Sequence, residues 1–277
     1  MPVLLMETLQ QLGVNQDPMA LADKIAQDTS MTVRILRIAN SPFYGMSREI
    51  GSLREAIVLL GLNRIRDMLM GICFSKMLQV RHKNFNYNQF WHHSIAVAEC
   101  SRQLSYCTGI SPDFAYTAGL LHDIGRLVIV LLFPDEYSQI IKAFESPQAE
   151  TERRLLGFDN VEIGGQAAQY WNLPVAIQEA IEQHETTPRP ISGSNAVRSL
   201  GLLVYTANFL ITQTERSDPL VIARDGVYAA NLPGAGAAFD DHESIQPALA
   251  ILNVSIDQAM HCANSGRQFA DQVVTLF

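Results

Sequence analysis

The chain has 277 residues, of which 48% are hydrophobic and 17% charged, and its formal net charge is −8. This composition supplies a sizeable core and excludes a chain that is disordered throughout, while the acidic balance argues against a general nucleic-acid coat. The longest apolar run, Leu127–Phe133, is far shorter than the roughly 20 residues that span a bilayer. Met1–Gly13 has no basic segment ahead of an apolar one, so we expect neither a secretory signal nor a membrane span.

The cysteines form no C-x-x-C pair and no recognisable disulfide framework. We interpret all four as buried thiols in a reducing compartment. Together with the expected lack of a signal, they predict a cytoplasmic location. The four are Cys73, Cys100, Cys107 and Cys262.

Charge divides the chain into two parts. Residues 1–88 carry ten Lys and Arg against seven Asp and Glu, a balance of +3. Residues 89–277 carry ten against twenty-one, a balance of −11. The difference predicts two parts with different surfaces, although a solvated face is its ordinary explanation.

Helix signals follow one another through the first part. Asp17-Pro18 is an N-cap followed by proline, and Ser30 can cap a second helix that must end before Pro42. Ser52–Glu55 is a capping box, and Gly61 ends the helix that it begins. A fourth helix is predicted to run to about residue 78, and the polar residues 84–88 form a linker.

The second part is predicted to be helical as well. Few segments alternate with period two, so the fold class is all-α. Residues 213–243 have no period and contain Ser217-Asp218-Pro219, which predicts a long surface excursion before a last helical stretch. The predicted helices lie near 89–108, 112–132, 134–145, 159–171, 174–184, 195–212 and 244–277.

Several polar side chains lie on apolar helix stripes. His93 shares a stripe with Val97 and Leu104, whereas His92 lies on a stripe that continues through Glu99 and reads as a solvent face. An inward histidine is more often a hydrogen-bonded core residue than a ligand, and an inward asparagine more often a helix–helix contact. Asp123 is harder to explain, because an unpaired buried carboxylate costs several kcal/mol, roughly. The inward polar residues are His93, His122, Asp123, His184 and Asn208, and three histidines with one aspartate are the composition of a metal site.

The segment Ala118–Arg126 reads AGLLHDIGR and resembles the His-Asp signature of the HD phosphohydrolase superfamily. The motifs around it resemble more specifically the HDOD family, a regulatory offshoot related to the HD-GYP phosphodiesterases. This resemblance extends over about residues 5–212. The further segments that carry it are Phe90–Ser94, Tyr170–Pro174, Ala180–Glu185, Ile38–Gly45 and Ala56–Gly61.

The charge division and the polar linker, together with the resemblance, predict an N-terminal helical bundle at 1–88, an HD-like helical domain at 89–212 packed on it, and an irregular excursion with a C-terminal helix at 213–277. The resemblance also implies metal ligands. The retained ligand positions are His93, His122, Asp123 and His184. Catalytic relatives have histidine at the positions of Asn160 and Glu185 and aspartate at that of Asn208, so this chain departs at three ligand positions.

These three changes argue against a centre that binds two metal ions. An amide at 208 offers only a neutral oxygen, Asn160 replaces an imidazole nitrogen, and the helical stripe of Glu185 points outward. One ion on three histidines and Asp123 remains possible, with zinc, iron or nickel suited to those donors. The site is equally sensible without metal, if the histidines are hydrogen-bonded by Asp123, Asn160 and Asn208. Arg126, beside the His-Asp pair, could hold a phosphate.

Three function classes follow. The first is an HDOD-type signalling or regulatory module that is non-catalytic and binds a protein partner or small ligand through the N-terminal bundle or the groove between the bundles. The alternative is a metal-dependent phosphohydrolase acting on a nucleotide or cyclic dinucleotide, although no Gly-Tyr-Pro segment follows the His-Asp pair. The third, nucleic-acid binding, is the weakest because the chain is acidic. Its patch would comprise Arg34, Arg37, Arg48, Arg54, Arg64 and Arg66.

Overall fold

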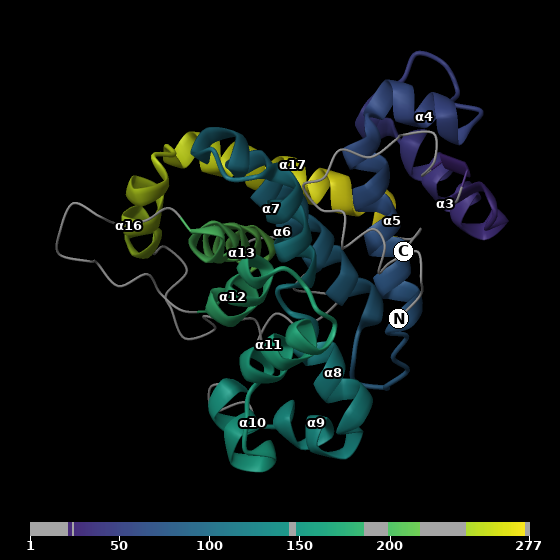
Figure 1. Ribbon diagram of the computed structural model, residues 1–277. Helices are drawn as coiled ribbons and strands as arrows, with labels where there is room; N and C mark the ends of the chain where they lie inside the picture. Colours follow the sequence, from purple (N-terminus) through teal and green to yellow (C-terminus); the bar gives the residue numbers. More distant parts are fainter. Residues whose placement is uncertain (1–21, 24, 144–147, 186–198, 217–241, 275–277) are drawn as a thin grey trace.

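The computed structural model describes residues 22–23, 25–143, 148–185, 199–216 and 242–274. These residues form helices and include no strand (Figure 1), which confirms the all-α class. In chain order the helices are α3 (Thr29–Ala39), the short 3-10 helix η1 (Pro42–Tyr44), α4 (Leu53–Leu60), α5 (Leu62–Met77), α6 (Tyr87–Thr108), α7 (Pro112–Leu121), α8 (Ile124–Leu132), α9 (Pro134–Ile140), α10 (Gln148–Leu156), α11 (Asn160–Tyr170), α12 (Val175–Gln183), α13 (Leu200–Arg216), α16 (His242–Leu252) and α17 (Ile256–Val273).

Helices α3, α4 and α5 pack against one another, and α3 and α4 lie at one end of the molecule (Figure 1). Asp28 caps α3, because its Oδ1 accepts a hydrogen bond from the backbone N–H of Met31 at 3.0 Å. The predicted cap at Ser30 is therefore wrong. The helix predicted after Pro18 begins outside the described residues.

Helix α4 begins where the sequence predicts. The Ser52 side chain accepts a hydrogen bond from Glu55 N at 3.1 Å. Glu55 Oε2 accepts from Gly51 N at 2.9 Å, so only the first half of the predicted capping box forms. Gly61 ends α4 with a φ of +88°, a conformation that favours glycine, and α5 follows it directly. The predicted stripe of α5 is buried: Ile65, Met68, Leu69 and Ile72.

Helix α6 is central and packs against α7, α13 and α17. Two glycines permit the close approach of its neighbours. A Cβ atom at Gly119 of α7 would lie 2.8 Å from Ala98 Cα, and one at Gly266 of α17 would lie 2.5 Å from Ala96 O. These distances are shorter than ordinary carbon contacts, so larger residues there would push α7 and α17 away from α6.

The helix predicted over residues 112–132 is in fact two helices. Helix α7 ends at Leu121, α8 begins at Ile124, and His122 and Asp123 form the corner between them. The stretch Pro112–Leu132 is long and apolar enough to cross a membrane, but 89% of its most apolar window is buried in the protein. It is a bent element of the core.

The C-terminal part also departs from the prediction. The stretch predicted near 244–277 contains two helices, α16 and α17, because the chain turns at Asn253 with a φ of +58° and restarts at the capping box of Ser255 and Gln258. Most of the predicted excursion, residues 217–241, lies outside the described residues. The division at residues 88 and 212 stays a prediction; α13 continues past 212 to Arg216.

The stripe of α6 that carries His92 and Glu99 was expected to face solvent. In the structure α17 packs along α6, the Glu99 side chain is fully buried, and the His92 side chain is only 13% exposed. The expectation is wrong because other helices cover this face: Asp271 of α17 contacts His92, and Arg64 of α5 pairs with Glu99.

Glu99 belongs to an ion-pair network that joins α5 to α6. Arg64 donates to both Glu99 oxygens, at 2.7 and 3.2 Å, and Arg102 pairs with Glu99 and with Asp67 at 2.8 Å. Arg66, which is 2% exposed, pairs with Asp113 of α7. The arginine patch considered for nucleic acids therefore loses two members, Arg64 and Arg66, to internal ion pairs.

Three of the four cysteines are buried, as predicted: Cys73, Cys100 and Cys262. Cys107 is exposed, which corrects the expectation for that thiol. It lies in the last turn of α6, two residues before the Gly109 cap, where that helix reaches the surface.

Candidate functional site

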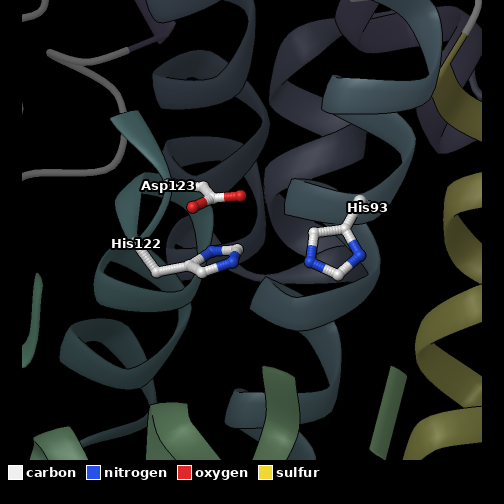
Figure 2. A group of neighbouring side chains, drawn as sticks. All are labelled: His93, His122 and Asp123. Carbon is white, nitrogen blue, oxygen red and sulfur yellow. The ribbon is translucent and has the colours of Figure 1, made fainter. Parts of the chain in front are cut away.

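The four retained ligand positions lie at helix ends or on the central helix, and all are at least 99% buried. His93 is on α6, His122 and His184 are the C-caps of α7 and α12, and Asp123 is the N-cap of α8. Figure 2 shows His93, His122 and Asp123 facing one another across the helix interface. The centroid of the His122 ring lies 5.3 Å from that of the His93 ring and 5.0 Å from that of the His184 ring.

These residues form two overlapping groups that share Asp123. In one, potential ligand atoms of His93, His122 and Asp123 lie within 4.8 Å of one another. In the other, those of Asp123, His184 and Glu185 do. The structure thus brings the predicted side chains together, but around a shared carboxylate and not around one point.

His122 and His184 are held alike. Each ring donates from Nδ1 to the carbonyl three residues earlier in its own chain segment, His122 to Gly119 O at 2.8 Å and His184 to Ile181 O at 2.6 Å. A donating Nδ1 leaves the lone pair on Nε2. Within the described part of the chain, His122 Nε2 and Asp123 Oδ2 have no hydrogen-bond partner, so both are potential ligand atoms. His184 Nε2 lies 3.4 Å from Asp123 Oδ1 and 3.7 Å from Glu185 Oε1. Burial lowers the pKa of His184, but Asp123 and Glu185 outweigh it and the pKa is raised.

His93 is held differently, because both of its nitrogens are engaged. Nδ1 lies 2.8 Å from Glu215 Oε2, and Nε2 lies 3.0 Å from Asn208 Oδ1. Since both partners are acceptors, the ring donates twice and is an imidazolium. Burial lowers the pKa of His93, but Glu215 outweighs it and the pKa is raised. Burial likewise opposes ionisation of Glu215, but His93 and His92 lower its pKa to about 2.

Asp123 is paired with a guanidinium. Arg126 Nε lies 2.9 Å from Asp123 Oδ1, and Arg126 Nη2 donates to Glu185 Oε1 at 3.3 Å. Burial raises the pKa of Asp123, but Arg126 and then His184 hold it well below its usual range. Burial also lowers the pKa of His122 to about 3, so that ring is neutral.

Glu185 corrects an expectation. The helical stripe pointed it outward, yet its side chain is only 21% exposed and turns toward Arg126, Asp123 and His184. The reason is local: α12 ends at Gln183, so helical periodicity no longer sets the direction of a side chain two residues later.

Asn208 and Asn160, which stand at ligand positions where this chain differs from catalytic relatives, have different hydrogen-bond partners. Asn208 accepts from His93, as the metal-free interpretation expected. Asn160 hydrogen-bonds a carboxylate, and no bond to a histidine is found among the described residues: its backbone N and Nδ2 donate to Glu152 Oε2 at 2.7 and 3.2 Å. Burial raises the pKa of Glu152, with Arg126 opposing.

Sequence reasoning missed two buried carboxylates of this region. Glu215 follows Asn208 at i+7, on the same stripe of α13, so a signal for it existed beyond the predicted end of that helix at residue 212. Glu152 lies on α10, for which no helix was predicted, and no periodic signal identified it.

The donors are of the kinds that zinc, iron or nickel prefer, and one ion could take its ligands from either group, His93–His122–Asp123 or Asp123–His184–Glu185. Of these donor atoms, His122 Nε2 and Asp123 Oδ2 are buried and have no hydrogen-bond partner among the described residues. The donor set does not fit two ions. The donors of a second ion would come from His93, which donates from both nitrogens, and from positions occupied by the neutral amides Asn160 and Asn208.

The fold is similar to that of several solved proteins. An HDOD domain protein with unknown function from Geobacter sulfurreducens superposes with a TM-score of 0.75, at 24% identity, over 100% of this chain and 92% of that one. A candidate phosphohydrolase from Shewanella amazonensis SB2B gives 0.68 at 24% identity over 99% and 94%. A candidate signal transduction protein from Marinobacter aquaeolei VT8 gives 0.73 at 19% identity over 99% and 58%.

Sequence comparison extends the same likeness. An uncharacterized protein of Treponema pallidum (strain Nichols) is 24% identical over 213 residues, which are 74% of this chain. The chain spans 41% of the length of that relative. The family model of the HDOD domain matches residues 2–187. That match covers well over half of the chain, together with His93, His122, Asp123 and His184, and the chain belongs to the HDOD domain family.

Proposed function

We propose that this chain is a non-catalytic regulatory HDOD module that acts by binding a protein partner or a small ligand. The observation that carries the proposal is that the protein supplies its own cations to the histidine centre. Arg126 pairs with Asp123, and the His93 imidazolium lies between Glu215 and Asn208.

The chemistry of a two-ion phosphohydrolase requires the opposite arrangement. Its ions hold the phosphate oxygens and lower the pKa of a bound water, and they need anionic or lone-pair donors free to ligate. Here the Arg126 guanidinium pairs with Asp123, and two ligand positions, 160 and 208, are neutral amides. Internal pairing satisfies the buried charge of Asp123 without an ion, which is what a module that has lost catalysis needs.

The test is turnover of a phosphoester by purified protein. Wild type and His122→Ala are incubated with bis(p-nitrophenyl) phosphate and with a cyclic dinucleotide, each in excess Zn²⁺, Fe²⁺ or Ni²⁺. We expect the same background rate from both proteins. Turnover by the wild type that His122→Ala abolishes would overturn the proposal.

We propose that the partner binds to the N-terminal bundle or in the groove between the bundles. In support, α3 exposes Val33, which is 50% exposed, and Arg37 one turn later, a mixed apolar and basic face. The variant Arg37→Glu should weaken partner capture at least tenfold, whereas Lys83→Glu, an exposed charge in the linker before α6, should not. Equal capture by both variants would move the contact elsewhere.

A second candidate, a metal-dependent phosphohydrolase acting on a nucleotide or cyclic dinucleotide, is favoured by the two groups of potential ligands that share Asp123. One divalent ion would be held by Asp123 with His93 and His122, or by Asp123 with His184 and Glu185, and it could lower the pKa of a bound water. Arg126 would then release Glu185 and contact the phosphate. This function predicts about one ion per chain by elemental analysis and its loss in Asp123→Ala; wild-type protein without stoichiometric metal after loading would exclude it.

A further inference from the structure

A line of polar contacts runs from the C-terminal helix to the histidine centre. Asp271 of α17 lies 2.8 Å from His92 Nε2, and the other nitrogen of His92 lies 3.6 Å from Glu215 Oε1. The second oxygen of Glu215 lies 2.8 Å from His93 Nδ1. Three helices, α17, α6 and α13, therefore contribute to one chain of contacts that ends in the centre.

Glu215 is the unusual member of this chain, because its side chain is fully buried. A buried carboxylate is destabilising unless cations or donors compensate it. Its two oxygens face two different imidazoles, and the shorter contact is the one to His93. With Nδ1 held by Glu215, the His93 ring can turn only with loss of that hydrogen bond, so Nε2 is directed toward Asn208 and the centre.

We infer that Glu215 is the positioning residue of His93 and that, through His92, it links the packing of α17 to the histidine centre. This inference goes beyond the proposed function, because it rests on contacts between residues of this chain and needs neither a partner nor a ligand. It applies equally to a module without metal and to one that binds an ion at the histidine centre.

The alternative role for Glu215 is charge compensation alone, with no influence on the ring. Substitution by glutamine and by leucine separates the two roles. Glu215→Gln removes the charge but keeps an oxygen that accepts from His93 Nδ1, whereas Glu215→Leu removes both. Thr206→Val is the matched control: Thr206 is fully buried on the same helix, and its hydroxyl donates to Leu202 O at 2.8 Å, away from His93.

The measurement is the assigned Nδ1–H signal of the His93 ring in ¹H–¹⁵N spectra of the full chain. We expect the signal in wild type, its retention in Thr206→Val and Glu215→Gln, and its loss in Glu215→Leu. Retention in Glu215→Leu, or loss in Thr206→Val, would overturn the positioning role. If Glu215→Leu does not fold, loss of the signal in the folded Glu215→Gln protein overturns the role in its place.

The link to α17 has its own test. Asp271→Asn removes the charge that holds His92, and Asp257→Asn changes an exposed aspartate at the other end of the same helix. We expect Asp271→Asn to shift the His93 ring signal and Asp257→Asn to leave it unchanged. An unchanged signal in both variants would show that α17 packing and the centre are independent.

Discussion

Burial acts on His122 and His93 with opposite results. Both rings lie inside the protein, where desolvation disfavours a positive charge. His122 donates only to a backbone carbonyl, and its pKa falls to about 3, whereas His93 meets the Glu215 carboxylate and its pKa rises. The partner of each ring, and not its depth, decides whether it is a neutral potential ligand or a cation. A ligand set read from residue types alone cannot separate these cases.

His92 allows a test of whether carboxylate partners keep a largely buried histidine ring protonated. Burial lowers its pKa, but Asp271 and Glu215 outweigh burial and raise it to about 9. A raised histidine pKa stabilises the fold fully below the ordinary value of about 6.5, and that contribution is lost as the pH rises through about 9. The variant His92→Gln should therefore lose stability relative to wild type by about 3 kcal/mol at pH 6 and by almost nothing near pH 10.

Urea unfolding of both proteins at several pH values measures this difference. Taking the difference cancels the groups whose pKa the substitution leaves unchanged, and Glu215, which His92 helps to keep ionised, has a pKa of about 2, below this pH range. A gap between wild type and His92→Gln that is constant across the range would contradict the assigned pairs.

At the scale of helices, close backbone approach positions the corner that carries His122 and Asp123. A Cβ atom at Gly125, in the first turn of α8, would lie 1.8 Å from Asn160 O and 2.9 Å from Gly164 N, both backbone atoms of α11. Backbone cannot move aside as a flexible side chain can. The glycine two residues after the His-Asp pair is therefore a packing requirement of the α8–α11 contact.

The variant Gly125→Ala should separate α8 from α11 and destabilise the fold by about 3 kcal/mol or more. Gly51→Ala is the control, because a Cβ there would meet only Glu55 Oε2 at 3.8 Å. We expect that control to stay within about 1 kcal/mol of wild type by urea unfolding. Similar stability of the two variants would show that α8 and α11 adjust freely.

At the scale of the whole molecule, buried ion pairs join the N-terminal helices to the rest. Arg102 of α6 pairs with Asp67 of α5 and with Glu99, and its guanidinium lies 5.0 Å from the centroid of the Tyr116 ring. Phe74 of α5 also packs against Trp171, with ring centroids 5.8 Å apart. These contacts predict that both parts of the molecule unfold together.

Arg102→Met removes the shared cation and leaves two buried carboxylates with fewer partners. We expect a cost of about 3–5 kcal/mol. Arg54→Met is the matched control: Arg54 and its partner Asp23 are each 65% exposed, so that change should cost no more than about 1 kcal/mol. The measurement is urea unfolding followed by tryptophan fluorescence and by circular dichroism. Two separate transitions in wild type, or equal costs for both variants, would contradict a single cooperative unit.

Local signals were sufficient for much of this protein. Periodicity identified the all-α class and most helices, and the helix stripes with the family motifs identified His93, His122, Asp123 and His184 as neighbours. Periodicity and motifs both depend on short stretches of chain, in which neighbouring residues decide which way a side chain points. Periodicity failed where helices end: it merged α7 with α8 and pointed Glu185 outward, because a side chain beyond the last turn no longer follows the helical repeat.

By itself, then, the sequence determined the helical class, the family resemblance and the identity of the histidines and aspartate that meet inside the fold. Only the tertiary structure decided which partner each of them has: Glu215 for His93, Arg126 for Asp123, and Glu152 for Asn160. It also decided that α17 and Arg64 of α5 cover the face of α6 once expected to be solvated. The physical reason is that a residue's own stripe depends on its near neighbours in the chain, whereas the charge or helix that meets this stripe comes from segments far away in sequence.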